Sequence, residues 1–353
     1  MRILIYGAGV LGSFYAAKLA EGGLDVSILA RGQRLSDIRR HGIVLEEMRG
    51  GRVTTTHVRT VEQLAPEDAY DLVLVFMRAS QVPGILPFLA SNEHTPSVVF
   101  LGNNAAGPGE MVEALGPERV LMGFGGTGGV RDGHVVRHLA GSGRRGAPIV
   151  IGELDGRTTP RLRRIAETLG KAGVEVSFSP NIEAYLKTHV ALVSPLANAI
   201  YMAGGDNHRL ARTRDAVVLC IRAIREGFKV LRAVDVPIEP SYLKAFEWVP
   251  EPVLAFLLGR LMDTEFAAIG VAGHANVARD EFRKLAEDFE ALARAAAVPT
   301  PAIQSLSRYI DPDFPVSADG SSDLAMDWGS VCIGLAALAG VLFVSWLRRS
   351  ERE

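Results

Sequence analysis

A glycine-rich turn near the N-terminus carries the clearest chemistry in this 353-residue sequence. It follows an apolar run, opens a helical pattern and reads G-x-G-x-x-G, as Gly7, Ala8, Gly9, Val10, Leu11 and Gly12. In this context the first glycine permits a tight turn, the second lets backbone approach a pyrophosphate, and the third lets helix and strand pack closely. Free N–H groups and the helix dipole attract the phosphates. The pattern predicts a dinucleotide site.

The end of the second apolar run distinguishes between the two nicotinamide cofactors. A domain that binds NAD usually has an acidic residue here, which accepts a hydrogen bond from the ribose 2′-hydroxyl. This sequence has no acid at that point and instead has Arg31 and Arg34. A guanidinium suits a 2′-phosphate because it donates paired, charge-assisted hydrogen bonds. We therefore expect NADPH, with Arg31 at its 2′-phosphate.

The elements that must position this site alternate between short apolar runs and helical patterns. Residues 3–6, 26–29, 72–77 and 98–101 read as strands, and the last two are apolar throughout, as in parallel strands covered on both faces. Residues 43–46 and 53–58 predict an inserted strand pair, and residues 120–129, 133–136 and 149–153 predict antiparallel strands. The sequence predicts an α/β, doubly wound Rossmann-type domain over residues 1–180.

The remainder of the chain has a different character. Residues 182–202, 214–234, 252–262 and 266–297 follow helical patterns, and no strand pattern occurs. We expect an all-α second domain over residues 181–310. The stretch 311–327 is rich in Pro, Ser, Asp and Gly, which predicts a linker.

The segment 328–347 contains no charged residue and would span about 30 Å as a helix, the thickness of a bilayer core. Trp328 and Trp346 lie at its ends, where interfacial aromatic residues are usual. These features predict a membrane anchor, and a buried or dimer-forming helix is the alternative. Arg348 and Arg349 follow it, against the positive-inside tendency for a cytoplasmic domain.

Composition excludes several other classes of protein. The formal charge of −2 gives no reason to expect nucleic acid as a partner. Cys220 and Cys332 lie far apart without metal-binding spacing, so neither a disulfide framework nor a metal site is predicted. An apolar strand begins directly after Met1, so we expect no secretory signal and a cytoplasmic location for the catalytic domains. A helical second domain is compatible with a homodimer, but no feature fixes the oligomeric state.

With these residues in view, the chain resembles the ketopantoate reductase (2-dehydropantoate 2-reductase) family over residues 1 to about 310. Besides the glycine turn and Arg31, the matching segments are residues 76–81, 101–107, 184–187, 279–281 and 298–301. The resemblance implies a Rossmann domain, a helical domain and an active site between them. It also implies NADPH as cofactor and a small 2-oxo acid as substrate.

The resemblance assigns roles to four further residues. Arg78 stands where the family usually has a lysine near the cofactor, and Asn104 takes the asparagine position beside the nicotinamide. Lys187 takes the position of the catalytic lysine, whose ammonium polarises the substrate carbonyl and donates the proton. Glu281, selected by its distance from Pro301, takes the position of the active-site glutamate. Glu265 is a rival in a similar motif but lies at the wrong distance.

The chain also departs from the family pattern. Ala191 and Pro195 replace asparagines that lie four and eight residues after the lysine, and Ile269 replaces a serine. These departures predict fewer polar contacts to the substrate and a pocket that is more apolar or differently shaped. Asn198 and His274 are the candidates for new substrate contacts.

Three functions remain open from the sequence. The leading hypothesis is NADPH-dependent reduction of a 2-oxo acid, ketopantoate or a relative, by a membrane-tethered enzyme. The second is reduction of another carbonyl or an imine on the same scaffold. The third is a cofactor-binding sensor without turnover, which the loss of the helix asparagines favours and the retention of Lys187 and Glu281 opposes.

Overall fold

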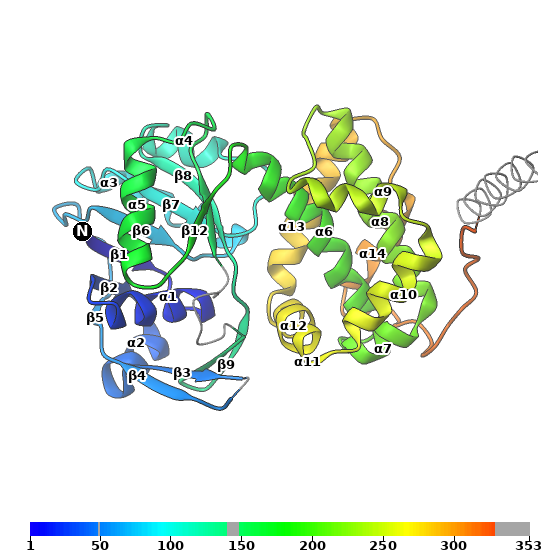
Figure 1. The fold of residues 1–353 in the computed structure, drawn as a ribbon, viewed down its shortest axis with the longest axis horizontal. Helices are drawn as coiled ribbons and strands as arrows, with labels where there is room; N and C mark the ends of the chain where they lie inside the picture. The colour runs from blue at the N-terminus through cyan, green and yellow to red at the C-terminus, as the bar shows by residue number, and fades with distance from the viewer. Residues whose placement is uncertain (49, 140–147, 329–353) are drawn as a thin grey trace, which may run out of the picture.

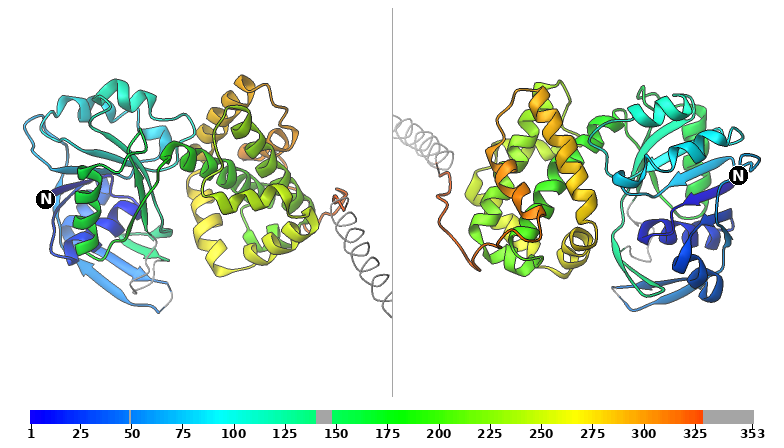
Figure 2. Two further views of the ribbon diagram at one scale, coloured as in Figure 1. Left: turned by 45° about the horizontal axis from the view of Figure 1, so that its top comes forward. Right: turned by 180° about the vertical axis from the view of Figure 1, so that it is seen from behind.

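A computed structural model describes residues 1–48, 50–139 and 148–328 of the chain. The two domains lie side by side, with α6 (Ile182–Met202) and α13 (Arg279–Ala295) on the side of the helical domain that faces the sheet domain (Figures 1 and 2). The Rossmann-plus-helical architecture predicted from the sequence is present.

The N-terminal domain contains an eight-stranded sheet in the order β12-β11-β8-β7-β6-β1-β2-β5. Its strands are β1 (Arg2–Tyr6), β2 (Asp25–Leu29), β5 (Arg59–Val61), β6 (Leu72–Val75), β7 (Val98–Leu101), β8 (Val120–Gly125), β11 (Ile149–Gly152) and β12 (Val176–Phe178). All neighbouring strands pair in parallel except β8 and β11. The strand order reverses at β1, because β2 follows on one side of it and β6 lies on the other. In open α/β sheets, ligands bind outside the carboxyl ends of the strands at such a switch point.

Helices cover both faces of this sheet. One face packs against α1 (Val10–Glu21), α2 (Gly32–His41) and α5 (Pro160–Lys171). The other packs against α3 (Leu86–Ser91), α4 (Gly109–Leu115) and the first turns of α6. Burial on both faces explains why β6 and β7 are apolar at every position.

A second, four-stranded sheet has the order β4-β3-β10-β9. It consists of β3 (Ile43–Glu47), β4 (Val53–Thr56), β9 (Gly129–Asp132) and β10 (Val135–His138). The predicted pair of inserted strands forms β3 and β4, and β10 joins β3 in parallel. Two of the predicted strands are too long. The strand predicted over residues 53–58 ends at Thr56, and the one predicted over residues 120–129 is divided into β8 and the start of β9.

Between residues 181 and 328 the structure contains helices and no strand. The α-helices besides α6 and α13 are α7 (Asn207–Arg212), α8 (Arg214–Ala233), α9 (Ala245–Trp248), α10 (Glu251–Met262), α11 (Glu265–Ala267), α12 (His274–Val277) and α14 (Pro301–Ser307). Short 3₁₀ turns lie at η1 (Ala79–Gln81), η2 (Ser241–Lys244) and η4 (Arg308–Ile310). The core between α6, α8, α10, α13 and α14 is built of Ala, Val, Ile, Leu and Phe side chains.

The prediction of one helix over residues 266–297 is wrong. A π-helical turn, η3 (Ala268–Gly273), follows α11, and the chain breaks again at Ala278 before α13. The π turn packs against the first domain: an added Cβ on Gly273 would lie 3.0 Å from Val130 Cγ1, and one on Gly128 would lie 3.5 Å from the Cα of Gly270. Glycine lets the two backbones approach, and it also weakens the α-helix.

The segment predicted as a linker, 311–327, lies along the helical domain. The Asp215 carboxylate accepts hydrogen bonds from the backbone of Asp323 and Leu324, at 3.0 and 2.9 Å. Arg222 donates to the carbonyl of Ala325 at 2.6 Å. These contacts fix the segment, although it contains neither helix nor strand.

Within residues 1–48, 50–139 and 148–328, no helix combines the length and apolar character needed to cross a bilayer. The predicted anchor at 328–347 lies outside the described residues except for Trp328.

Candidate functional site

The glycine turn joins β1 to α1 and is shaped by three different constraints. Gly7 has φ +108°, and an added Cβ there would lie 2.6 Å from the Phe76 carbonyl oxygen. An added Cβ on Gly12 would overlap the carbonyl oxygen of Gly7. Gly9, the N-cap of α1, is different, because an added Cβ would meet no atom of the described residues within 4 Å. The open space at Gly9 and the free N–H groups of Val10 and Leu11 fit a bound pyrophosphate.

The two arginines after β2 have separate environments. Arg34 is only 7% exposed and donates to the Ala8 carbonyl oxygen at 3.1 Å and to Ser13 Oγ at 2.8 Å. It therefore supports the glycine turn from behind. Arg31 is exposed, donates to the Glu62 carbonyl oxygen at 3.3 Å, and lies 5.7 Å from the ring centroid of Phe88. Only Arg31 has a guanidinium accessible to a 2′-phosphate.

Arg78 joins the two domains. It follows β6, and its guanidinium donates to Asp280 Oδ1 and to the Val277 carbonyl oxygen, each at 2.7 Å. The resemblance assigns Arg78 to the cofactor site, whereas its guanidinium bonds the helical domain and holds it beside the carboxyl edge of the sheet.

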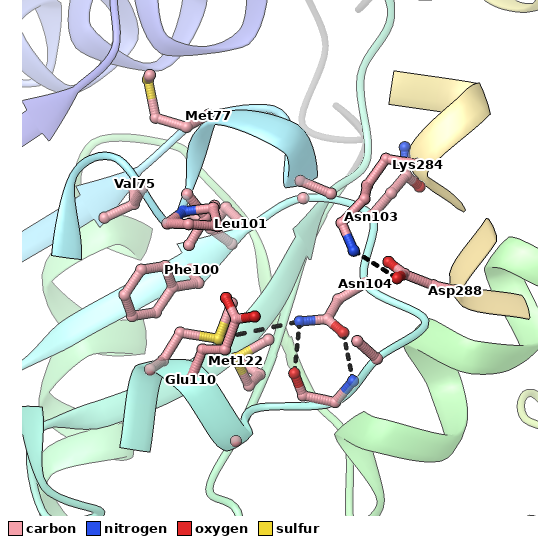
Figure 3. A pocket seen from close by; sticks show the side chains of 18 residues that line it. Val75, Met77, Phe100, Leu101, Asn103, Asn104, Glu110, Met122, Lys284 and Asp288 are labelled. Atoms are coloured by element: carbon pink, nitrogen blue, oxygen red, sulfur yellow. Dashed lines mark hydrogen bonds and ion pairs between the residues drawn. The ribbon is translucent and has the colours of Figure 1, made fainter. Parts of the chain in front are cut away.

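The loop after β7 contains two adjacent asparagines that face different ways. The Asn104 side chain is turned into its own loop, where Nδ2 donates to the Gly107 carbonyl oxygen at 3.0 Å and Oδ1 accepts from the Gly107 N–H at 2.6 Å (Figure 3). Asn103 Nδ2 instead donates to Glu281 Oε1 at 3.0 Å. Asn103 Oδ1 is buried without a hydrogen-bond partner among the described residues. Asn103, to which the sequence assigns no role, therefore donates to Glu281 and has a buried acceptor oxygen without a partner among the described residues.

Glu281 lies at the start of α13 and is only 3% exposed. His274 Nε2 lies 3.7 Å from Glu281 Oε2. A spacing of seven residues would place His274 and Glu281 on one face of a single helix, whereas they belong to α12 and α13 on either side of the break at Ala278. Burial lowers the pKa of His274, aided by the charge of Arg78 and opposed by that of Glu281.

His189 adds a second imidazole near His274. It projects from α6 onto Phe124, with ring centroids 4.1 Å apart. Burial and the charge on His274 lower the pKa of His189 to about 4, so His189 is neutral at pH 7. No helical spacing signals this arrangement, because it depends on the end of β8 and on α12.

Lys187 lies in the second turn of α6 and is mostly buried. Its Nζ pairs with Glu183 Oε1 at 2.5 Å, one turn earlier, and Glu183 is half exposed. An added Cβ on Gly107 would lie 3.2 Å from Glu183 Oε1, so the asparagine loop packs against this ion pair. In the loop after β7, Gly107 thus packs against the Lys187–Glu183 pair, and Asn103 bonds Glu281.

The other sequence-predicted positions lie away from this loop. Asn198 is buried in α6 on the same face as Lys187, about 16 Å further along the axis, and its Oδ1 has no partner among the described residues. Ala191 and Pro195 are buried in the helical domain, with Ala191 packed against Gly227. Glu265 is exposed. The structure thus brings Asn103, Lys187, Glu281 and His274 to one edge of the sheet.

The sequence profile described as "Ketopantoate reductase PanE/ApbA" matches residues 3–156. The chain is 29% identical to a 2-dehydropantoate 2-reductase of Mesorhizobium japonicum over 52% of this chain and 61% of that protein. It thus spans about three fifths of the length of that relative. It is 25% identical to a 2-dehydropantoate 2-reductase of Halobacterium salinarum over 69% of this chain and 79% of that protein.

Solved structures show the same fold. A 2-dehydropantoate 2-reductase of Geobacter metallireducens matches with a TM-score of 0.73 and 18% identity, covering 88% of this chain and 99% of that one. D-mandelate dehydrogenase, solved with NADH and anilino(oxo)acetate, matches with a TM-score of 0.72 and 19% identity, covering 88% and 98%.

Proposed function

We propose that the chain is a member of the ketopantoate reductase family, whose profile matches residues 3–156, and that it is an NADPH-dependent reductase of a 2-oxo acid, ketopantoate or a relative. The observation that carries the proposal is the hydrogen bond between Asn103, at the carboxyl edge of the sheet, and the buried Glu281 of the helical domain. It brings an amide and a carboxylate from different domains to the edge where the glycine turn lies.

Three features of the chain support NADPH as the cofactor. The open space at Gly9 would take the pyrophosphate, and the exposed guanidinium of Arg31 would pair with the 2′-phosphate. Asn103 Oδ1 and the Oγ1 of Thr127, between β8 and β9, are both buried without a hydrogen-bond partner among the described residues. Asn103 Oδ1 would accept a hydrogen bond from a bound group, and Thr127 Oγ1 would donate one. When bound, NADPH supplies the hydride that adds to the carbonyl carbon.

Lys187 would act as the acid of the reaction. Its ammonium is paired with Glu183, so the proton that the developing alkoxide needs is present at Nζ. The cation also stabilises the negative charge on the carbonyl oxygen before the proton is transferred. Because Glu183 is half exposed, it would return a proton from solvent to Lys187 after each turnover.

Glu281 and Asn103 would position the substrate. A carboxylate this buried requires donors, and Asn103 and His274 face its two oxygens. Glu281 therefore stays held at one place, where it accepts from a hydroxyl of the substrate or product. We propose Asn103, in place of Asn104, as the asparagine of the site.

The test is NADPH oxidation by the full-length chain with ketopantoate and a panel of 2-oxo acids. Lys187→Ala should lower kcat by at least 100-fold. Lys171→Ala, an exposed lysine at the end of α5, is the matched control and should leave kcat unchanged. If NADPH binds tightly but no 2-oxo acid is reduced, the sensor hypothesis replaces this proposal.

We further propose that residues 328–347 tether the enzyme to a membrane, since this segment carries no charge over 20 residues. The full-length chain should float with lipid vesicles and resist extraction by alkaline carbonate. Release by carbonate would refute the tether without affecting the proposed activity.

A further inference from the structure

A pocket of about 260 Å³ lies beside the proposed site, on the α4 face of the sheet (Figure 3). It is bounded by the segments that follow β6 and β7, by the start of α4, and by α13 of the helical domain. The pocket therefore spans the boundary between the domains, as the site does.

The floor of the pocket is apolar. Val75, Phe100 and Met122 are paired neighbours on β6, β7 and β8, so their side chains lie side by side on one face of the sheet. Met77 and Met111 also line it. Methionine side chains adapt their shape to a ligand, and none of these five offers a hydrogen-bond donor.

The polar residues that line the pocket include Glu110 at the start of α4, besides two asparagines and an ion pair. Asn103 and Asn104 both line the pocket, so it is contiguous with the amide that bonds Glu281. Lys284 and Asp288 pair at 2.5 Å across one turn of α13. A ligand with one polar end and one apolar end fits this arrangement, with its polar end at Asn103.

The size of the pocket exceeds what a methyl group needs. An apolar cavity of about 150 Å³ is large enough for benzene. The hydroxyl of a hydroxylated side chain such as that of ketopantoate would lose its bonds to water on this floor and would find no partner there.

Resting on the proposed function, we propose that this pocket binds the side chain of the 2-oxo acid and selects apolar side chains of about four or more carbons, aliphatic or aryl. The 2-oxo acid group lies toward Asn103, Lys187 and Glu281, and the side chain lies over Phe100 and Met122.

The experiment measures kcat/KM of the full-length chain at saturating NADPH for pyruvate, 2-oxobutanoate, 2-oxopentanoate, 2-oxohexanoate and phenylglyoxylate. Each added methylene should raise kcat/KM about three- to fourfold until the pocket is full. Trimethylpyruvate, which is ketopantoate without its hydroxyl, should exceed ketopantoate. A flat series with measurable turnover would overturn the pocket assignment and leave the proposed function intact, whereas no turnover of any 2-oxo acid would overturn both.

Two exposed helical glycines provide a matched pair of variants. Gly109 lines the pocket and Gly170 lies on α5. At either position an added Cβ would meet none of the atoms that the structure describes within 4 Å. Gly109→Leu should lower kcat/KM for 2-oxohexanoate by at least tenfold with pyruvate little changed, and Gly170→Leu should change neither. A rise in the Kd of NADPH in Gly109→Leu, with the substrate ratio unchanged, would show that the pocket belongs to the cofactor and overturn the proposal.

A widening variant tests the same assignment from the opposite direction. Met111→Ala enlarges the pocket, and Leu115→Ala, one turn later on α4 and equally buried, does not. Met111→Ala should shift the preference toward phenylglyoxylate and longer chains. An equal shift in Leu115→Ala would attribute the effect to loss of stability and refute the assignment.

Discussion

The choice between two adjacent asparagines offers the sharpest test of the site. Asn103→Ala removes the donor to Glu281 Oε1, and the Glu281 carboxylate is 3% exposed. A hydrogen bond to a charged group contributes about 1.5–3 kcal/mol. If this contribution is lost from the transition state, kcat/KM should fall about 10- to 100-fold, because each 1.4 kcal/mol corresponds to about tenfold.

Asn104→Ala is the matched control, one residue away. It removes two hydrogen bonds within the loop, both to Gly107. These are neutral bonds, each contributing about 1 kcal/mol to stability. We therefore expect the free energy of unfolding to fall by about 2 kcal/mol, with kcat/KM reduced by no more than about fivefold.

Urea unfolding and initial rates of NADPH oxidation, measured on both variants, separate the two roles. Asn103→Asp adds a carboxylate that faces Glu281 and should impair activity more than Asn103→Ala. The reasoning fails if Asn104→Ala abolishes activity while Asn103→Ala retains it. That outcome would return the catalytic role to Asn104, as the sequence alone predicts.

Three further predictions concern the cofactor and pH. Gly9→Ala should fold normally yet raise the Kd of NADPH at least tenfold, whereas Gly12→Ala should destabilise the fold, because its Cβ would overlap a backbone oxygen; thermal unfolding and NADPH titration distinguish them. Arg31→Ala should weaken NADPH about 10- to 100-fold and NADH much less, and Arg34→Ala should chiefly lower stability. Because the folded-state pKa of His189 is about 4 and the unfolded value is about 6.5, its contribution to stability is complete above pH 6.5 and is lost as pH falls toward 4. Unfolding free energy should drop by up to about 2 kcal/mol from pH 7 to pH 5, and His189→Phe should remove this drop; an unchanged slope in that variant would exclude His189 as its source.

The sheet and the glycine turn could be predicted because their signals are local. A run of apolar residues covered on both faces, as in β6, needs no information from distant parts of the chain. Gly7 and Gly12 are required by contacts with their own turn and with the end of β6. Arg31 and Arg34 are three residues apart, yet only the fold shows that Arg34 is buried behind the turn and Arg31 is exposed.

The helix break could not be predicted in the same way. Residues 266–297 carry a continuous helical pattern, but Gly270 and Gly273 pack against the β8–β9 segment and β9, which lie about 140 residues earlier. The resulting π turn and the break at Ala278 place His274 beside Glu281 from a separate helix. A seven-residue spacing in one continuous helix would also bring His274 and Glu281 together. In the structure they approach each other from two separate helices, α12 and α13.

The site is assembled from contacts between the domains, and this has a consequence for specificity. Asn103–Glu281 and Arg78–Asp280 each join residues about 200 positions apart in the sequence. The glycine turn and Arg31, by contrast, lie entirely within the first domain. Substitutions on α13, such as at Lys284, can therefore alter the wall of the proposed substrate pocket while the glycine turn remains as it is. This separation is consistent with a chain that lacks the helix asparagines and keeps the glycine turn and Arg31.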